Sequence, residues 1–244
     1  MKFYHLFFVL LLNLTALNSF CQQTIVPGKK VAKQKWIRDQ DYKMKWIMLR
    51  DTARVEVGTV HTKVKVSKKT ILVITAVNLK GTTSSWIDST IVNKTDFSPI
   101  YHSSSNGQRD MMLRFGANIT GYYLDKTSGQ RTQIAQQVDK GYFDSNFYPM
   151  LLAWLPIDTS LKADINIFDY NPNGKTGLLK ARVIKVSPGI FPGKKLGERS
   201  VWIIEATDDI AGATSHYYFD KLTRQLFKQE ITAGNRRMEM NLIE

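Results

Sequence analysis

The sequence predicts a mainly β protein: a single curled antiparallel sheet (a half-barrel or open barrel with meander connections) and one short buried helix near residues 145–155. Two observations lead to this prediction. Short runs of β-branched and aromatic residues recur along most of the chain, separated by turns rich in glycine, proline and asparagine. One segment, Met150 to Leu155, interrupts the pattern because it is apolar throughout. Strands of this length and spacing form a sheet that is long enough to curl.

The expected strands are clearest in the last quarter of the chain. Val201 to Glu205 and Ser215 to Phe219 are rich in β-branched and aromatic residues, and Asp220 to Arg224 forms the turn that follows. Between Val55 and Val66 the apolar residues alternate, and the apolar face switches near Gly58, which predicts a β-bulge there. The full set of expected strands is 42–49, 55–66, 70–79, 84–92, 99–103, 111–115, 119–124, 131–138, 163–170, 177–186, 201–205, 215–219, 225–231 and 238–243.

One hairpin sequence occurs twice. Tyr122 to Gln130 and Tyr217 to Gln225 share two tyrosines, an aspartate, a lysine and a glutamine at matching positions. The aspartate can accept hydrogen bonds from turn amides in both copies. Either the chain contains a duplicated half-domain, or two unrelated hairpins use the same turn residues.

The predicted helix follows a candidate cap. Asp144 to Asn146 are expected to cap its N-terminus, and Pro156 is expected to end it. A short helix that is apolar nearly all round must be buried on most sides. We therefore place it against the concave face of the curled sheet.

The chain divides into three predicted parts: a signal peptide (1–21), a flexible leader (22–40) and a single antiparallel β domain (41–244). The signal has a basic start followed by an apolar run from Leu6 to Leu17. This run is shorter than the roughly 20 residues that span a membrane, and no later segment is apolar enough, so no transmembrane span is expected. The leader contains few apolar residues. A periplasmic or secreted protein is predicted.

Cys21 is the only cysteine and lies at the expected processing site. Cleavage after Ser19-Phe20-Cys21 removes it with the signal peptide. The alternative keeps Cys21 as a lipidated first residue, which the large Phe20 disfavours. In both cases the thiol has no intrachain partner, so disulfides do not stabilise the fold. The sequence does not indicate an oligomeric state.

The charge of the chain is strongly positive. Lysine and arginine number 34 against 21 acidic residues, a formal net charge of +13. Such an excess indicates anionic partners. Export argues against nucleic acid and favours lipid head groups, lipopolysaccharide or acidic glycans as partners; alternatively, the basic surface serves only solubility. Two basic clusters are present, Lys63, Lys65, Lys68 and Lys69 in one strand-turn region and Lys29, Lys30, Lys33 and Lys35 in the leader.

Motifs for catalysis, cofactors and metals are not found, so neither an enzyme nor a cofactor nor a metal site is expected. Asp169 to Gly174 resembles the first half of a calcium loop, but Lys180 occupies the position where that loop needs glutamate. His61, His102 and His216 lie in separate segments, without a second ligand at metal-binding spacing. No Gly-x-Ser-x-Gly nucleophile motif occurs.

Parts of the chain resemble a family of Gram-negative envelope proteins known only as domains of unknown function. The matching residues are Trp86 to Thr90 with Asp96 to Ile100, Met150 to Pro156, and Trp202 with Tyr217 to Arg224. That family in turn distantly resembles the lipoprotein carriers, whose fold is a curled antiparallel half-barrel closed by helices. The resemblance runs from about residue 42 to the C-terminus and implies a hydrophobic concavity able to hold an acyl chain.

The leading functional expectation is a non-enzymatic envelope protein that binds a lipid, a lipoprotein tail or another apolar ligand in this concavity. Trp86, Trp154 and Trp202 are the expected ligand-binding residues, because their segments should converge on one face. A competing interpretation is that these tryptophans only fill the core. The alternative function is adhesion or assembly, in which the basic surface contacts lipopolysaccharide, another anionic glycan or a partner protein.

Overall fold

The computed structural model describes residues 23–51, 53–83, 85–139 and 141–244. One 16-stranded sheet with open ends dominates it, and along the sheet the strand order is β1-β11-β12-β13-β14-β15-β16-β2-β3-β4-β5-β6-β7-β8-β9, with β10 paired to β11. Nearly all neighbouring strands are antiparallel, as in a meander. The predicted fold class, a mainly β protein with a single curled sheet and one short helix, is confirmed.

The strands and helices have the following bounds: β1 Gln23–Ile25, η1 Gln34–Trp36, β2 Gln40–Arg50, β3 Ala53–Val66, β4 Thr70–Leu79, β5 Ser85–Asn93, β6 Pro99–Ser105, β7 Arg109–Arg114, β8 Ile119–Asp125, β9 Arg131–Gln136, β10 Phe143–Asp144, α1 Tyr148–Trp154, β11 Ala163–Asp169, β12 Gly177–Gly193, β13 Gly197–Asp208, β14 Thr214–Asp220, β15 Leu226–Ala233 and β16 Arg236–Leu242. Strand β12 extends well beyond the expected 177–186, because residues 188–193 also pair with β13.

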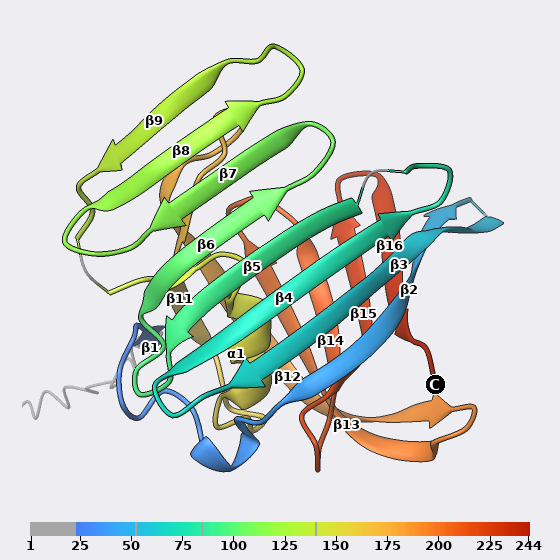
Figure 1. The fold of residues 1–244 in the computed structure, drawn as a ribbon. Helices are drawn as coiled ribbons and strands as arrows, with labels where there is room; N and C mark the ends of the chain where they lie inside the picture. Colours follow the sequence, from blue (N-terminus) through green and yellow to red (C-terminus); the bar gives the residue numbers. More distant parts are fainter. Residues whose placement is uncertain (1–22, 52, 84, 140) are drawn as a thin grey trace, which may run out of the picture.

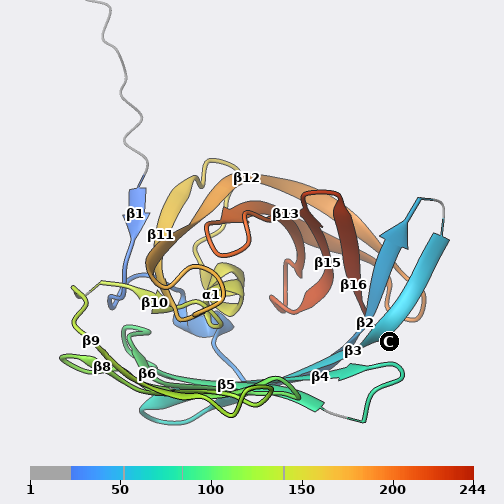
Figure 2. The ribbon, with the colours of Figure 1, turned by 90° about the horizontal axis from the view of Figure 1, so that it is seen from above.

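The sheet bends over into two layers that enclose α1. Strands β2 to β9 form one layer and β11 to β16 the other (Figure 1). Seen from above, the sheet follows a C-shaped course with α1 inside it (Figure 2). The layers are joined where β16 pairs with β2, which sets Met240 opposite Trp46. This pairing connects the first long strand of the chain to its last.

The predicted bulge is present in β3. Trp46 of β2 lies opposite Gly58, whereas the next residue, Ile47, lies opposite Glu56, so β3 contains one extra residue at this point. A Cβ atom on Gly58 would lie 2.2 Å from the carbonyl oxygen of Asn78, which explains why only glycine fits here. The bulge keeps apolar residues on the concave face on both sides of the slip.

Helix α1 is buried along almost its whole length. Six of its seven residues are buried, the exception being Pro149 in the first turn. The expected cap is wrong: the residue before the helix is Phe147, and no side chain caps it. Asp144 instead accepts hydrogen bonds from the Asn146 amide, at 2.9 Å, and from His102. A buried carboxylate beside a histidine is better satisfied by that partner than by helix amides one turn away.

Two apolar clusters fill the space between the layers. The larger surrounds α1, where the rings of Phe97, Phe147 and Trp154 pack with centroids about 6 Å apart. The smaller joins the strands near the β9 edge to the opposite layer, with Leu113 and Phe168 among its members. Side chains therefore close the fold on the side where the strands do not pair.

The structure differs from the flexible leader expected for residues 22–40. Strand β1 pairs in parallel with β11, and Ile25 and Ile37 are buried in the larger cluster. The Lys33 amide donates to the carbonyl of Trp154 at the end of α1. The few apolar residues of this segment suffice to anchor it, because the edge of β11 and the end of the helix leave backbone groups that need partners.

The expectations for residues 1–21 concern a part of the chain outside the described residues. The signal peptide, its cleavage and the fate of Cys21 therefore remain predictions. Among the residues that are described, no helix is long and apolar enough to cross a membrane.

Trp154→Ala tests how much the fold depends on packing around α1. The Trp154 side chain is fully buried. Its removal should lower the free energy of unfolding by about 3–5 kcal/mol, because a large cavity remains. Leu222→Ala is the control: this side chain is 75% exposed, so the change should be within about 0.5 kcal/mol. Urea denaturation measures both, and equal effects would show that the core is elsewhere.

Candidate functional site

A cavity of about 170 Å³ lies between the two layers beside α1. One wall comes from β2, β3 and β4, and the other from β14, β15 and β16. Its apolar lining includes Tyr42, Met44, Val60, Val73, Phe219 and Met240. The volume is close to the roughly 150 Å³ of an engineered cavity that holds benzene, and is below the roughly 300–1,000 Å³ of a typical ligand pocket. The cavity can hold a small group or one end of a longer ligand.

Polar groups also line this cavity, and only some of them have a hydrogen-bond partner in the described residues. Burial raises the pKa of Tyr42 to about 12, against an opposing hydrogen bond from Thr62. Gln229 donates to the hydroxyl of Ser215 at 3.4 Å. Both side-chain amide atoms of Gln40 are buried and have no hydrogen-bond partner in the described part of the chain. Such a group loses its hydration without replacement, so it is a candidate for contact with a ligand.

Arg224 is the most unusual residue that lines the cavity. It is 6% exposed, and its Nε and Nη1 atoms are buried without a hydrogen-bond partner among the described residues. Burial lowers the pKa of its guanidinium, against the opposing effect of the Asp220 carboxylate. Its backbone has φ +60°, in the left-handed region that is rare for residues other than glycine.

Asp220 has other partners than Arg224. Its carboxylate forms an ion pair with Arg199, at 2.9 Å, and accepts the backbone amides of Leu222 and Thr223. The Asp220 carboxylate is therefore paired with Arg199, and the side chain of Arg224 forms no ion pair in the described residues.

The sequence matches a family model, described as a protein of unknown function (DUF3108), over residues 41–241. The chain belongs to this family. The match extends from the start of β2 almost to the end of β16 and so includes all the strands that line the cavity. The predicted membership of a domain-of-unknown-function family is confirmed. A comparison with curated proteins finds no match.

The DUF3108 domain places its three candidate ligand-binding tryptophans in different surroundings. Trp154 is enclosed in the core cluster around α1. Trp202 is partly buried at the margin of that cluster, and the ammonium of Lys221 lies 4.3 Å from its ring centre. Trp86 donates its Nε1–H to Asp88 at 2.9 Å and lines a separate open cleft of about 610 Å³. The three side chains do not meet at one cavity.

Arg224 and Gln40 were not among the residues expected from sequence. The repeated hairpin contained a signal for Arg224. In the copy from Tyr122 to Gln130, the equivalent position is Gly129, which has φ +74°. Glycine tolerates this conformation without strain, whereas arginine does not. A large charged residue at a position suited to glycine indicates a role other than turn formation.

A second polar cluster of the DUF3108 domain lies between β5, β6 and β10. Nδ1 of His102 is 2.9 and 3.0 Å from the two carboxylate oxygens of Asp144, and Thr90 donates its hydroxyl to the same carboxylate at 2.9 Å. Asn146 donates to Thr90 at 3.1 Å. Burial disfavours the charged imidazole, but the Asp144 charge and hydrogen bond outweigh it and raise the pKa of His102.

The histidine–carboxylate pair does not form a catalytic triad. An acyl-transfer nucleophile would have to hydrogen-bond Nε2 of His102. In the described residues this atom is buried and has no partner, while the neighbouring Thr90 hydroxyl bonds to Asp144 instead. A search of the same residues finds no cluster of side chains able to hold a metal ion. The pair connects β6 to the segment before α1, which is a structural role.

The His102–Asp144 pair predicts a pH-dependent stability. Folding raises the pKa of His102, so the protonated form of this histidine stabilises the fold. This stabilisation is fully present below the unfolded pKa of about 6.5. It is lost as the pH rises through the pKa of the folded state. The free energy of unfolding should fall over this window in the wild type and fall less in His102→Gln. His216→Gln is the control and should keep the wild-type fall. Urea titrations at several pH values measure the three profiles, and identical profiles would refute the role of the pair.

Proposed function

We propose that this protein is a non-enzymatic binding protein that holds one end of an apolar or amphipathic ligand, such as a lipid or a lipoprotein tail, between the two layers of its sheet. The observation that carries the proposal is the 170 Å³ cavity, whose walls are mainly apolar and which is also lined by Gln40 and Arg224, whose buried nitrogens have no hydrogen-bond partner among the described residues. Fold-level likeness to lipoprotein carriers agrees with it as an analogy.

The energetics of an empty apolar cavity support this proposal. Protein interiors are packed nearly as densely as organic crystals, and voids larger than a water molecule are few. Side chains that line a void lose dispersion contacts on one side. An apolar group that enters the cavity restores these contacts and removes its own surface from water, so the apolar walls favour an occupant.

Val60→Trp tests the cavity as the binding site. Val60 is buried and lines the cavity, so an indole at this position should fill it. The wild type should bind 1-octanol with a negative heat-capacity change, the sign of apolar burial. At a ligand concentration of 100 times Kd, it should gain about 2.7 kcal/mol of stability. Val60→Trp should show neither effect in calorimetry.

Val55→Trp is the matched control. Val55 lies on the same strand, is 43% exposed and does not line the cavity, so this variant should bind as the wild type does. Circular dichroism must show that both variants are folded. The proposal is rejected if wild-type protein purified without detergent carries no lipid in native mass spectrometry and also fails to bind 1-octanol.

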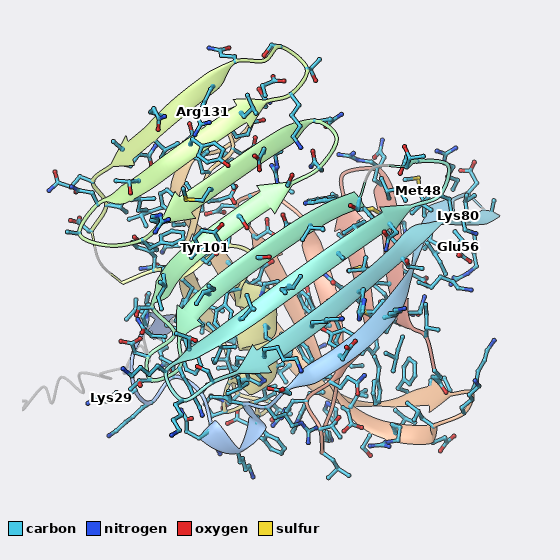
Figure 3. The ribbon with its side chains drawn as sticks, viewed as in Figure 1. Lys29, Met48, Glu56, Lys80, Tyr101 and Arg131 are labelled. Carbon is cyan, nitrogen blue, oxygen red and sulfur yellow. The ribbon has the colours of Figure 1, made fainter. Side chains whose placement is uncertain are left out.

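The basic surface supports a second candidate function, contact with anionic envelope polymers. The β3–β4 turn, the β5–β6 turn and the segment after β1 meet at one end of the described structure: the Lys94 amide donates to the Lys69 carbonyl, and the Gly28 amide to the Asp96 carbonyl. Lys29 lies at this end (Figure 3). The lysines gathered here without an ion pair in the described residues are Lys29, Lys30, Lys68, Lys69 and Lys94.

Lys68→Ser with Lys69→Ser tests this second function. Wild-type protein should be retained by immobilised lipopolysaccharide at low salt and released as salt rises, because exposed charges are screened beyond about 10 Å at 0.1 M. The double variant should elute at lower salt. Lys63→Ser with Lys65→Ser is the control with the same charge change, since both lysines already pair with Asp41 and Asp39. Equal elution of all three proteins, or retention that salt does not alter, would contradict the prediction.

A further inference from the structure

We propose that Arg224 makes the cavity selective for a ligand with a single carboxylate, with the guanidinium bound to the carboxylate and the adjoining carbon chain against the apolar wall. This inference rests on the proposed function and specifies its ligand class. Four observations support it: the unpaired nitrogens of Arg224, the absence of an ion pair to its charge among the described residues, the position of Trp36 and the strained backbone.

Two nitrogens of the Arg224 side chain have no hydrogen-bond partner in the described residues. A guanidinium has five N–H donors and no acceptor, and it stays charged in proteins. Within the described residues, Nε and Nη1 of Arg224 are buried and make no hydrogen bond, although the side chain is more than nine-tenths buried. Leaving a buried charge without a partner is among the most costly arrangements in a fold. An anion in the cavity supplies the missing acceptors.

The charge balance favours a ligand with one negative charge. Asp220 is the acidic group whose charge acts on Arg224, and it already pairs with Arg199 at 2.9 Å. Because Arg199 already pairs with Asp220, the positive charge of Arg224 has no ion-pair partner in the described residues. A carboxylate neutralises it, whereas a phosphate monoester brings about −1.5 to −2 and would leave an excess negative charge in a buried site.

Trp36 covers one face of the Arg224 guanidinium, and Gln40 adds a second polar group beside it in the cavity. The central carbon of the Arg224 guanidinium lies 4.7 Å from the centre of the Trp36 ring. Such stacking covers one face of the guanidinium but provides no acceptor for its N–H groups, which lie in the plane. The unpaired amide of Gln40 lines the same cavity and adds an N–H donor for a carboxylate oxygen.

The backbone of Arg224 indicates that the side chain has a function. The left-handed conformation is less favourable for arginine than for glycine, because arginine has a Cβ atom. The matching hairpin has Gly129 at this point, with φ +74° against +60° for Arg224. Arg224 destabilises the ligand-free protein in two ways: its backbone is in a strained conformation, and its buried charge has no hydrogen-bond acceptor for Nε and Nη1 in the described residues. Such a combination is typical of a binding residue.

The experiment compares ligands of equal chain length and different head groups. Calorimetry on the full-length protein measures Kd for octanoate, 1-octanol and octyl phosphate at a pH of about 8. Octanoate should bind the wild type about 10- to 100-fold more tightly than 1-octanol, the difference expected for hydrogen bonds to a charged group. Octyl phosphate should bind more weakly than octanoate.

Arg224→Gly and Arg224→Met separate binding from folding. Arg224→Gly removes both the strain and the buried charge, so the empty protein should melt at a higher temperature, while octanoate and 1-octanol should bind equally. Arg224→Met should also lose the preference for octanoate. Arg38→Met is the control: Arg38 is exposed and donates to the carbonyl of Thr223 in the same turn, so its removal should leave the preference intact.

The affinities for octanoate, 1-octanol and octyl phosphate test the ligand cavity and the role of Arg224 separately. If neither octanoate nor 1-octanol binds the wild type, the proposed function itself fails. If both bind with equal affinity, the ligand cavity stands and the carboxylate inference is overturned. A preference for octanoate that persists in Arg224→Gly would assign the selectivity to other groups and overturn the role of Arg224. Tighter binding of octyl phosphate would replace the carboxylate by a doubly charged head group.

Discussion

The need to bury an uncharged helix on every side shapes this fold. Helix α1 is seven residues long, and none of them carries a charge. So short a helix is not stable alone and obtains its stability from packing. One flat sheet would cover only one side of it. The sheet therefore bends over at the β16–β2 pairing, so that β3, β4 and β5 pack on one side of α1 and β11 to β14 on the other.

Polar groups inside this enclosure differ in how many of their hydrogen bonds are made. The carboxylate of Asp144 has three partners, in His102, Thr90 and its own loop, and the cluster holds the segment before α1 against β6. Arg224 and Gln40 lie in the same interior but have no such partners among the described residues. A buried polar group that is fully paired contributes to a unique structure, while an unpaired one that lines a cavity is a candidate for contact with a ligand. This contrast, more than the aromatic content, locates the candidate site.

The sequence predicted the strands and the helix because their patterns are local. Alternation along β3 and the apolar run of α1 depend on neighbours only a few residues away, and even the bulge at Gly58 could be predicted. The cavity depends instead on contacts between distant segments, such as Met240 opposite Trp46 and Arg224 beside Trp36. The same limit explains the wrong cap at Asp144, whose partner His102 is 42 residues away. The attachment of the leader was missed because its few buried residues, such as Ile25 and Ile37, form no periodic pattern on their own.

The pairing of β16 with β2 also has a consequence for the order of assembly. During synthesis β2 is made long before β16, since about 190 residues separate them. Each layer can form its own hairpins from neighbouring strands, but the backbone pairing that joins the two layers forms only once β16 has been made. Loop closure over such a distance is slow compared with hairpin formation. We therefore expect a chain without β16 to expose apolar sheet surface, which makes an incomplete chain prone to aggregation.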